Sequence, residues 1–581
     1  MSDDTWHQDA VIYQLHVKTF CDSNGDGIGD FRGLIGKLDY LQRLGVTCLW
    51  LLPFYESPLR DDGYDISHYE RIHPHYGTMA DVDAFLQEAH RRELRVITEL
   101  VINHTSDQHP WFQAARHAPA GSAKRDFYVW SDTPDRYAQA RIIFSDAEES
   151  NWTWDPVAGA YYWHRFFRHQ PDLNFDNPHV RQAVLKVMRF WLDKGVDGLR
   201  LDAIAHLYER EGTSCDNLPE THALLKWMRA DMNVRYDPRV LLAEANQPPE
   251  ELRAYFGDGD ECHMAFHFPL VARLFAAFAD ADRTPIVEIM QRSTNLPAGC
   301  QWGLFLRNHD DVSLSALGAQ ENERLMAIYA PEERMRLHGG ICRRLAPLLA
   351  HDPRRIEMAH ALLLSLPGTP VIYYGDEIGM SDRLDLADRD GLRTPMQWDD
   401  SPGGGFTSGR PTIPLNEDPE WGVSRINVER AAATPSSLLN RIMTMLAARR
   451  PHTAFGRGSL TFVEAGDRAV LSFVREHDDD VMLVVVNLAD RPAALDVPLP
   501  GYSACHVAGC ASGVDVRPRT GEGLTVTLPA YGWCWCPLRS VDKGGRESFF
   551  EDTSDTVTEG GGVSSKNDSR PPFQRAASHS P

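Results

Sequence analysis

Three carboxylates, Asp202, Glu244 and Asp310, stand at the ends of short apolar runs and could carry out chemistry. A carboxylate without a partner is costly to bury, so packing alone gives no reason to place one after each run. An ionised carboxylate can act as a nucleophile, and a protonated one can act as a general acid. The three positions are therefore candidate catalytic residues.

Asp202 has a cationic residue two positions before it. Residues 198–202 read Gly-Leu-Arg-Leu-Asp, and side chains in a strand alternate between two faces, so Arg200 and Asp202 share a face. A buried guanidinium lowers the pKa of a neighbouring carboxylate and holds it ionised, as a nucleophile requires. The same pattern also fits a structural ion pair, and these two residues alone do not decide between the readings.

Glu244 lies among apolar and small residues in segment 241–245. Such surroundings could desolvate it and keep it protonated as a general acid, although an acid at a helix N-terminus is the alternative. His309 precedes Asp310, and Asn103 with His104 follows another apolar run. A single histidine there is more often structural, but polar groups at four strand ends favour a site.

Eight short apolar runs rich in β-branched residues are each followed by a helical pattern, which is typical of parallel strands with crossover helices. Such an arrangement predicts an α/β fold with a (β/α)8 barrel, whose active site lies at the carboxyl ends of the strands. The runs are 10–17, 46–53, 95–103, 198–203, 240–246, 262–268, 302–308 and 370–375.

A chain of 581 residues exceeds what one hydrophobic core usually serves. We expect the barrel in residues 1–104 and 170–450, interrupted at 105–169 by an aromatic-rich inserted subdomain, because that stretch is too long for a normal loop. Alternating patterns predict a C-terminal antiparallel β-sandwich domain at 451–540. Segment 541–581 has few apolar residues and is predicted to be disordered.

The composition excludes several classes of function. No segment approaches the about 18 uninterrupted apolar residues of a membrane span. The 82 acidic and 59 basic residues give a net charge of −23, which repels nucleic acid but not a neutral ligand. Residues 1–6 are acidic and polar, unlike a secretory signal, so we expect a cytoplasmic protein. A homo-oligomer is compatible with this composition.

The ten cysteines include no CxxC pair, so the sequence indicates neither a disulfide framework nor a zinc site. We expect reduced thiols. Cys534 and Cys536 alternate with aromatic residues, which predicts that both lie on one face of a strand in a core.

These motifs resemble those of the α-amylase superfamily, glycoside hydrolase family 13, from about Gln8 to Leu538. The resemblance implies that Asp202 is the nucleophile and Glu244 the general acid/base. It implies that Asp310 is a third carboxylate that binds the 2- and 3-hydroxyls of the sugar and stabilises the transition state.

The same resemblance implies a pocket for one terminal glucose. Asp61 and Tyr64 stand in a segment similar to the one that binds and stacks that glucose, and Arg393 would close the pocket against its fourth hydroxyl. Arg200, His104 and His309 are implied to line the same pocket.

Segments 51–63, 103–112 and 255–268 are most similar to members that isomerise maltose to trehalose within one active site, with minor hydrolysis to glucose. There are departures: Glu99 replaces a usual Asp, and segments 205–206 and 311–313 differ from the common pattern. The alternatives are a hydrolytic α-glucosidase acting on maltose, sucrose or isomaltose linkages, a non-catalytic carbohydrate-binding relative, and a transferase acting on glucan.

Segment 22–30 places oxygen-bearing side chains at alternate positions between glycines, which favours a Ca²⁺ loop over a simple turn because three carboxylates within nine residues repel one another. No organic cofactor is expected. The resemblance implies as ligands Asp22, Asn24, Asp26, the Ile28 carbonyl and Asp30, with Mg²⁺ as an alternative ion.

A second metal site is implied by the resemblance alone. It would fix the inserted subdomain to the barrel. Its ligands would be Asn103, Asp172, Glu209 and the carbonyls of His206 and Leu207.

Overall fold

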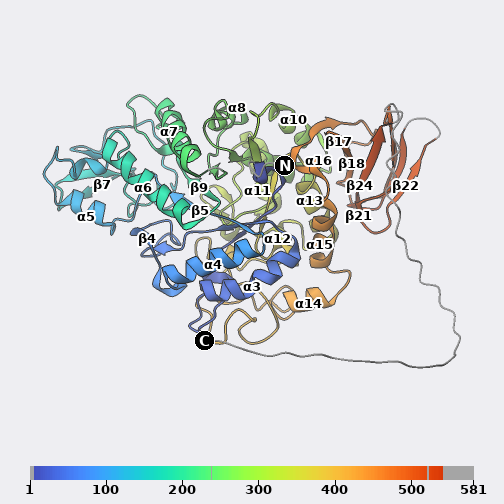
Figure 1. The fold of residues 1–581 in the computed structure, drawn as a ribbon, viewed down its shortest axis with the longest axis horizontal. Helices are drawn as coiled ribbons and strands as arrows, with labels where there is room; N and C mark the ends of the chain where they lie inside the picture. The colour runs from blue at the N-terminus through green and yellow to red at the C-terminus, as the bar shows by residue number, and fades with distance from the viewer. Residues whose placement is uncertain (1–4, 237, 505, 520–522, 541–581) are drawn as a thin grey trace, which may run out of the picture. The chain divides into compact units, whose positions relative to one another are not determined.

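The computed structural model describes residues 5–236, 238–504, 506–519 and 523–540. The predicted disorder at 541–581 lies outside the described residues. The described part contains a closed barrel of eight parallel strands, an inserted subdomain and a C-terminal pair of sheets (Figure 1).

All eight predicted strands form, and they close in the order β1-β15-β12-β11-β10-β9-β5-β2. Almost every residue in them is buried, because the barrel interior is filled by side chains and the outer face is covered by helices. The strands are β1 (Ile12–Leu15), β2 (Cys48–Leu51), β5 (Arg95–Val101), β9 (Gly198–Asp202), β10 (Val240–Ala243), β11 (Met264–Phe266), β12 (Gln301–Phe305) and β15 (Thr369–Tyr373).

The barrel helices have clear start and stop signals. Helix α3 begins where the Asp30 side chain accepts from the backbone of Gly33 and ends at Gly45 in the left-handed conformation. Asn177 and Gly195 bound α6 in the same way. The long helices are α3 (Phe31–Leu44), α4 (Met79–Arg91), α6 (Pro178–Lys194), α7 (Pro219–Tyr236), α9 (Phe268–Asp280), α10 (Thr284–Arg292), α11 (Ala319–Tyr329), α13 (Pro353–Leu363) and α15 (Leu438–Arg449).

Shorter elements lie in the loops and before the C-terminal sheets. The hairpins are β3 (Tyr55–Glu56) with β4 (His68–Ile72), and β13 (Arg336–Leu337) with β14 (Gly340–Ile341). The short helices are α1 (Trp6–Asp9), α2 (Val17–Phe20), α8 (Pro249–Leu252), α12 (Leu345–Leu348), α14 (Val428–Ala433) and α16 (Thr453–Arg457).

The segment predicted to be an inserted subdomain contains helix α5 (Pro110–Arg116) and a small sheet in the order β6-β8-β7. Its strands are β6 (Trp130–Ser131), β7 (Trp152–Asp155) and β8 (Ala160–Trp163). Trp152 and Trp163 pack in a hydrophobic cluster separate from that of the barrel. An isolated bridge between His104 and Asp172 joins the two ends of the insertion to the barrel.

Two antiparallel sheets form the C-terminal sandwich. A six-stranded sheet contains β16 (Ser459–Phe462), β17 (Val470–His477), β18 (Asp480–Asn487), β20 (Tyr502–Ala504), β21 (Gly509–Cys510) and β24 (Trp533–Ser540). A three-stranded sheet contains β19 (Ala493–Val497), β22 (Asp515–Pro518) and β23 (Leu524–Leu528). The first strand of this sheet begins at Ser459, after helix α16.

The central strands of the large sheet, β17, β18 and β24, are buried on both faces. Cys534 and Cys536 share the face that packs between the two sheets, as their alternation predicts. Trp533 and Trp535 share the opposite face and belong to the hydrophobic cluster of the barrel. The sandwich is therefore fixed to the barrel by apolar packing.

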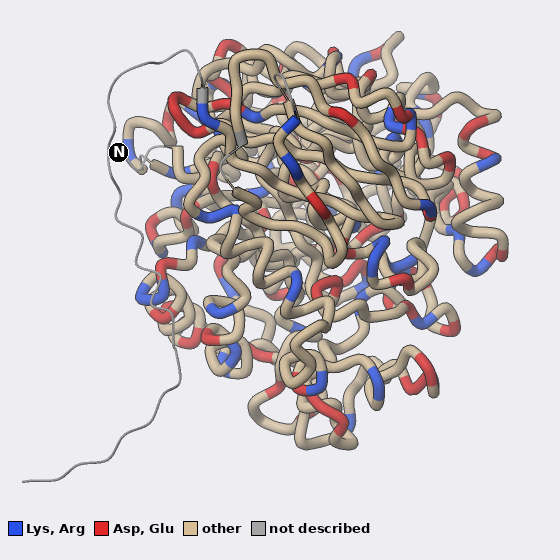
Figure 2. The backbone as a smooth tube through the Cα atoms, turned by 90° about the vertical axis from the view of Figure 1, so that its right-hand side faces the viewer, with Lys and Arg blue, Asp and Glu red and all other residues tan. Residues whose placement is uncertain are grey.

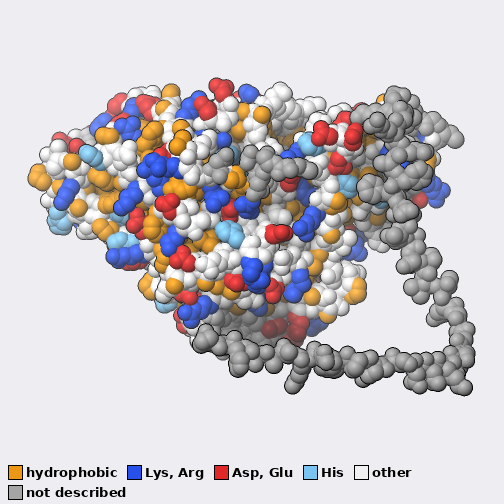
Figure 3. All heavy atoms as spheres, in the orientation of Figure 1, with side chains coloured by type: hydrophobic (Ala, Val, Ile, Leu, Met, Phe, Trp, Pro, Cys, Tyr) orange, Lys and Arg blue, Asp and Glu red, His pale blue; other side chains and the backbone are white. Residues whose placement is uncertain are grey.

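On the described surface, basic and acidic residues are interspersed (Figure 2). Hydrophobic side chains on the visible face form small groups among polar ones (Figure 3). None of the described helices is long and apolar enough to cross a membrane.

Candidate active site

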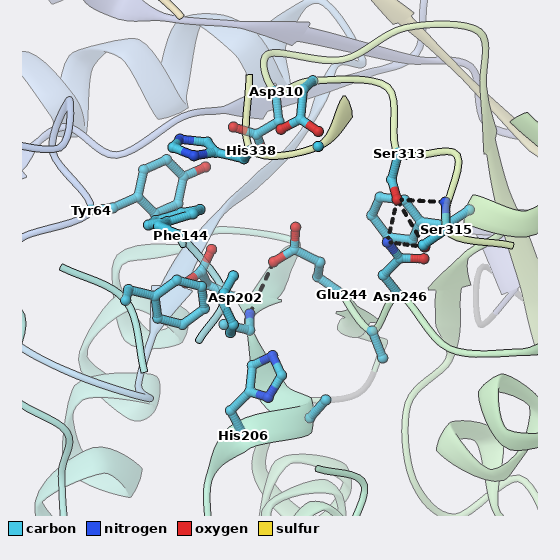
Figure 4. Close-up of a pocket in the computed structure, with 18 of the residues that line it drawn as sticks. Tyr64, Phe144, Asp202, His206, Glu244, Asn246, Asp310, Ser313, Ser315 and His338 are labelled. Atoms are coloured by element: carbon cyan, nitrogen blue, oxygen red, sulfur yellow. Dashed lines mark hydrogen bonds between the residues drawn. The ribbon is translucent and has the colours of Figure 1, made fainter. Parts of the chain in front are cut away.

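A cavity of about 400 Å³ opens at the carboxyl ends of the barrel strands, beneath the inserted subdomain. Figure 4 shows Asp202, Glu244 and Asp310 around the same space. The volume is in the usual range for a small-molecule site. Six of the predicted catalytic and substrate-binding residues line it: Asp61, Tyr64, His104, Asp202, Glu244 and Asp310.

Arg200 lies directly behind this wall and is shared by three carboxylates. Its Nη1 atom lies 2.6 Å from Oδ1 of Asp202 and 2.8 Å from Oε2 of Glu99, and its Nη2 atom lies 2.6 Å from Oε1 of Glu244. Strands β5, β9 and β10 are neighbours in the barrel, which is why these side chains meet. The cation holds the acidic groups close together despite their repulsion.

Burial raises the pKa of Asp202 to about 7, although Arg200 opposes the shift. The expectation that Arg200 by itself holds Asp202 fully ionised is therefore corrected. One positive charge is divided among Glu99, Asp202 and Glu244, so it does not offset the burial of each of them.

Burial also raises the pKa of Glu244 to about 7, as expected for a general acid. Its side chain is 20% exposed and faces the cavity. The backbone N–H of Ala203 donates to Oε2 of Glu244 at 2.9 Å. Ala203 follows strand β9 directly and has a φ of 50°, an uncommon left-handed conformation for a residue other than glycine.

Asp310 differs from Asp202 and Glu244, because the charges around it lower its pKa. Burial alone raises its pKa, but His309, Arg389 and Arg393 together lower that pKa well below its usual range. The two arginines lie 2.9 Å and 3.0 Å from Oδ1 of Asp310. Asp310 is therefore held ionised, as a carboxylate that stabilises positive charge requires.

Tyr64 and His309 form a stacked pair, with ring centroids 5.6 Å apart. Gln14 Nε2 lies 2.7 Å from Nδ1 of His309, so Nδ1 accepts and Nε2 carries the proton. The Tyr64 hydroxyl lies 2.7 Å from that Nε2 atom and donates to Glu99 at 3.2 Å. His309 thus orients Tyr64 from behind the cavity wall.

The structure assigns to Arg389 the position that the sequence predicted for Arg393. Arg389 lines the cavity and binds both Asp61, at 2.6 Å, and Asp310, at 2.9 Å. Arg393 is 1% exposed and lies behind Asp310, where it also binds Asp62 at 2.9 Å. Both arginines lie in the long segment between β15 and α14, and the only sequence signal for Arg389 is its position between two aspartates.

The outer part of the cavity consists of residues that were not singled out from the sequence. Arg141, Ile143, Phe144 and Phe166 come from the insertion, whose aromatic richness was the available signal, and the rest come from loops that follow other barrel strands. These residues include Arg141, Ile143, Phe144, Phe166, Asn246, Ser313, Ser315 and His338.

Three residues of the implied second metal site, Asn103, Asp172 and Glu209, are buried and each present an oxygen atom that could bind a cation. The atoms Oδ1 of Asn103, Oδ2 of Asp172 and Oε1 of Glu209 are buried and have no hydrogen-bond partner. Burial raises the pKa of Asp172 and of Glu209, and the Asp172 charge adds to the shift at Glu209. An oxygen-rich group of this kind fits a hard cation such as Ca²⁺.

The Asp22–Asp30 loop is different, because its side-chain oxygens accept hydrogen bonds, most of them from the loop itself. Asp22 accepts from the backbone of Asn24, Gly25 and Gly27 and from Thr407. Asp30 caps helix α3 and accepts from Ser23. Among the described residues, no three acidic, histidine or cysteine side chains converge as metal ligands.

The chain matches two family models. Residues 14–340 and 342–458 match the alpha amylase catalytic domain, and residues 460–535 match the maltogenic amylase C-terminal domain. Together they cover the barrel, its insertion and the sandwich.

Relatives and solved structures agree with the models. The chain is 51% identical to the trehalose synthase/amylase of Mycolicibacterium smegmatis, with 93% of this chain and 94% of the relative covered. It is 50% identical to the trehalose synthase of a Pimelobacter species, over 93% and 97%. The crystal structure of a trehalulose synthase from Pseudomonas mesoacidophila is similar with a TM-score of 0.76 at 28% identity, over 92% and 99%.

Proposed function

The chain belongs to the alpha-amylase family, and on that premise we propose that it isomerises maltose to trehalose within one active site. The observation that carries the proposal is the arrangement of Asp202 and Glu244 on one guanidinium, opposite the ionised Asp310. Relatives with the name trehalose synthase, at about half identity over nearly the whole chain, support the choice of substrate.

The first half of the reaction forms a covalent intermediate. An Asp202 carboxylate oxygen attacks C1 of the non-reducing glucose, the bond from C1 to the glycosidic oxygen breaks, and Glu244 gives its proton to that oxygen. Asp310 and the Tyr64 ring bind the same glucose, and the negative charge of Asp310 stabilises the positive charge that develops at C1. The products of this half are a β-glucosyl enzyme and glucose.

The second half needs the released glucose to stay and turn. Its anomeric hydroxyl then attacks C1, Glu244 takes the hydroxyl proton, and the bond from C1 to Asp202 breaks. Two inversions at C1 restore the α configuration of the donor, and attack by the hydroxyl of an α-anomeric glucose then gives the α,α-1,1 linkage. If water attacks instead, the product is glucose, so minor hydrolysis accompanies isomerisation.

Enclosure decides between the two acceptors. Bulk water is about 55 M, whereas a well-oriented nucleophile can reach an effective molarity of ~10⁵ M. The retained glucose therefore outcompetes water only while the cavity holds it in a reactive orientation, and exclusion of water adds to this advantage. The inserted subdomain and the loops that line the outer cavity would supply this enclosure.

We extend the proposal to a resident Ca²⁺ held by Asn103, Asp172 and Glu209. The three unpartnered oxygens support it, and the ion would stabilise the junction of the insertion with the barrel. The Asp22–Asp30 loop is a second candidate for a cation site. There, the hydrogen bonds that its carboxylates accept would compete with binding of the ion.

Incubation with maltose tests the proposed function. Nuclear magnetic resonance of the products should show the 1,1 linkage of trehalose as the main signal, with free glucose minor. Labelled glucose added to the solution should scarcely enter trehalose if the acceptor never leaves. Glucose as the dominant product under mild conditions would support the hydrolytic α-glucosidase instead.

A further inference from the structure

We propose that the contact of His338 with Phe144 and Asp146 determines how the glucosyl enzyme divides between the retained glucose and water. The inference rests on the proposed function and assigns its product ratio to specific residues. Phe144 and Asp146 belong to the inserted subdomain, whereas His338 comes from the hairpin of β13 and β14. The contact therefore joins two sides of the cavity.

The two sides are joined by a ring stack and two hydrogen bonds. Phe144 and His338 both line the cavity, and their ring centroids are 4.1 Å apart with the planes at 28° (Figure 4). The backbone N–H of His338 donates to Asp146 at 3.2 Å, and its Nδ1 lies 2.8 Å from the same carboxylate. The His338 side chain is 7% exposed.

The hairpin holds His338 in place. His338 and Gly339 have φ values of 48° and 79°, as in the tight two-residue turns that hairpins favour. A Cβ atom at Gly340 would lie 1.9 Å from Oδ2 of Asp311, so this strand packs directly against the residue after Asp310. The hairpin turn at His338 is thus fixed relative to Asp310. The contact joins the inserted subdomain to this turn.

Phe144 extends the contact toward the glucose-binding end. Its ring centroid lies 4.7 Å from that of Phe167 and 5.5 Å from that of Phe166. The Arg389 guanidinium lies 6.0 Å from the Phe144 ring, and Arg389 binds both Asp61 and Asp310. The stacked rings therefore lie beside Arg389, which binds two of the residues proposed to hold the terminal glucose.

The strength of the contact suits a reversible closure. The Asp146 side chain is 46% exposed, and polar contacts at such positions are weak. A weak contact can open to admit maltose and close again during the reaction. Its loss should admit water to the intermediate while leaving Asp202 and Glu244 in place.

The test uses the full chain with Asp146→Ala, His338→Gly and the double variant. Asp146 is exposed, so its truncation does not threaten folding, and glycine keeps the left-handed turn at 338. Glu332→Gln is the matched control, because it removes an exposed ion pair with Arg334 in the same loop. Folding is checked by circular dichroism, and the chemistry by release of nitrophenol from 4-nitrophenyl α-glucoside.

With maltose as substrate, each single variant should raise the glucose-to-trehalose ratio about threefold or more, as expected for the loss of a weak closing contact. In the double variant the glucose-to-trehalose ratio should be no higher than in the stronger single variant, because one substitution already breaks the contact. The control should keep the wild-type ratio. Labelled external glucose should enter trehalose in the Asp146 and His338 variants but scarcely in wild type or in the control.

Two results would overturn the inference. If wild type makes trehalose and a folded Asp146→Ala variant keeps the same ratio, the contact does not control product choice. If wild type makes no trehalose at all, the proposed function is wrong and the inference fails with it.

Discussion

Asp202 and Glu244 are bound by the two ends of one guanidinium. Nη1 of Arg200 lies 2.6 Å from Oδ1 of Asp202, and Nη2 lies 2.6 Å from Oε1 of Glu244. The relative position of the proposed nucleophile and the proposed acid is thereby fixed before substrate binds. A change in Arg200 or in either carboxyl group therefore affects both halves of the reaction.

Asp202→Asn should abolish turnover of maltose, with a loss of about a thousandfold or more, because an amide cannot form the glucosyl intermediate. The fold should remain, since an amide of the same size still fits beside Arg200. Steady-state rates and the melting temperature measure the two effects. Activity within about tenfold of wild type would remove Asp202 from the nucleophile role.

Glu244→Gln should slow maltose turnover strongly but should spare formation of the intermediate from substrates with good leaving groups. Such leaving groups depart without a proton, so they do not need the acid. Burst kinetics with 4-nitrophenyl α-glucoside compare the two cases. An equal loss with both substrates contradicts the assignment of Glu244 as the acid.

The pH profile of kcat/KM should be bell-shaped with its maximum near neutrality. Burial raises the pKa of Asp202 and of Glu244 to about 7 each, and the active form has Asp202 ionised and Glu244 protonated. Below the maximum Asp202 gains a proton, and above it Glu244 loses one. The two carboxyl groups interact, so each limb of the profile gives an apparent pKa of the pair and not of one residue.

Glu99→Gln should move the acidic limb of that profile to lower pH. Burial is the main cause of the raised Asp202 pKa, but the Glu99 charge adds to it, and Glu99 also shares Arg200. Removal of the charge favours ionised Asp202. Maltose rates from about pH 5 to 9 measure the shift. An unchanged acidic limb would show that Glu99 does not influence the nucleophile.

Arg389→Lys should lower kcat/KM by roughly tenfold to a hundredfold, since lysine cannot bridge Asp61 and Asp310 as a planar guanidinium does. Arg389 faces the cavity, so the loss of kcat/KM should be larger than any accompanying loss of melting temperature can explain. Kinetics with maltose check this. If kcat/KM stays within about twofold, Arg389 does not bind substrate.

Chelation with EDTA should lower the melting temperature, because an ion bound only by the folded state stabilises it, by about 2.7 kcal/mol at a concentration a hundredfold above Kd. Glu209→Gln should remove most of this response. Glu211→Gln is the matched control, because Glu211 is exposed and paired with Arg136. No shift and no metal by elemental analysis would leave both metal sites without support.

The sequence by itself determined the barrel. Strands that are buried on both faces must be continuous apolar runs, so segments such as 198–203 and 370–375 were recognisable without any tertiary information. Polar residues at the ends of those runs had to meet at one rim, because parallel strands in a barrel point the same way. That geometry brought Asp202, Glu244 and Asp310 into one candidate site.

Only the tertiary structure decided how charges are shared. The segment 198–202 predicted a pair of Arg200 and Asp202, but Glu99 and Glu244 come from neighbouring strands and take part of the same charge. The choice between Arg389 and Arg393 also depends on where a long loop folds back over Asp310. Neither outcome follows from local alternation.

The contact of His338 with Asp146 shows most clearly what local sequence patterns do not determine. His338 and Asp146 are 192 positions apart, and each lies in a loop with no periodic pattern that fixes its direction. Local spacing determines which residues share a face of one element, whereas contacts between distant loops depend on the packing of the whole fold. The sequence therefore identified the catalytic groups, and the tertiary structure decided what encloses them.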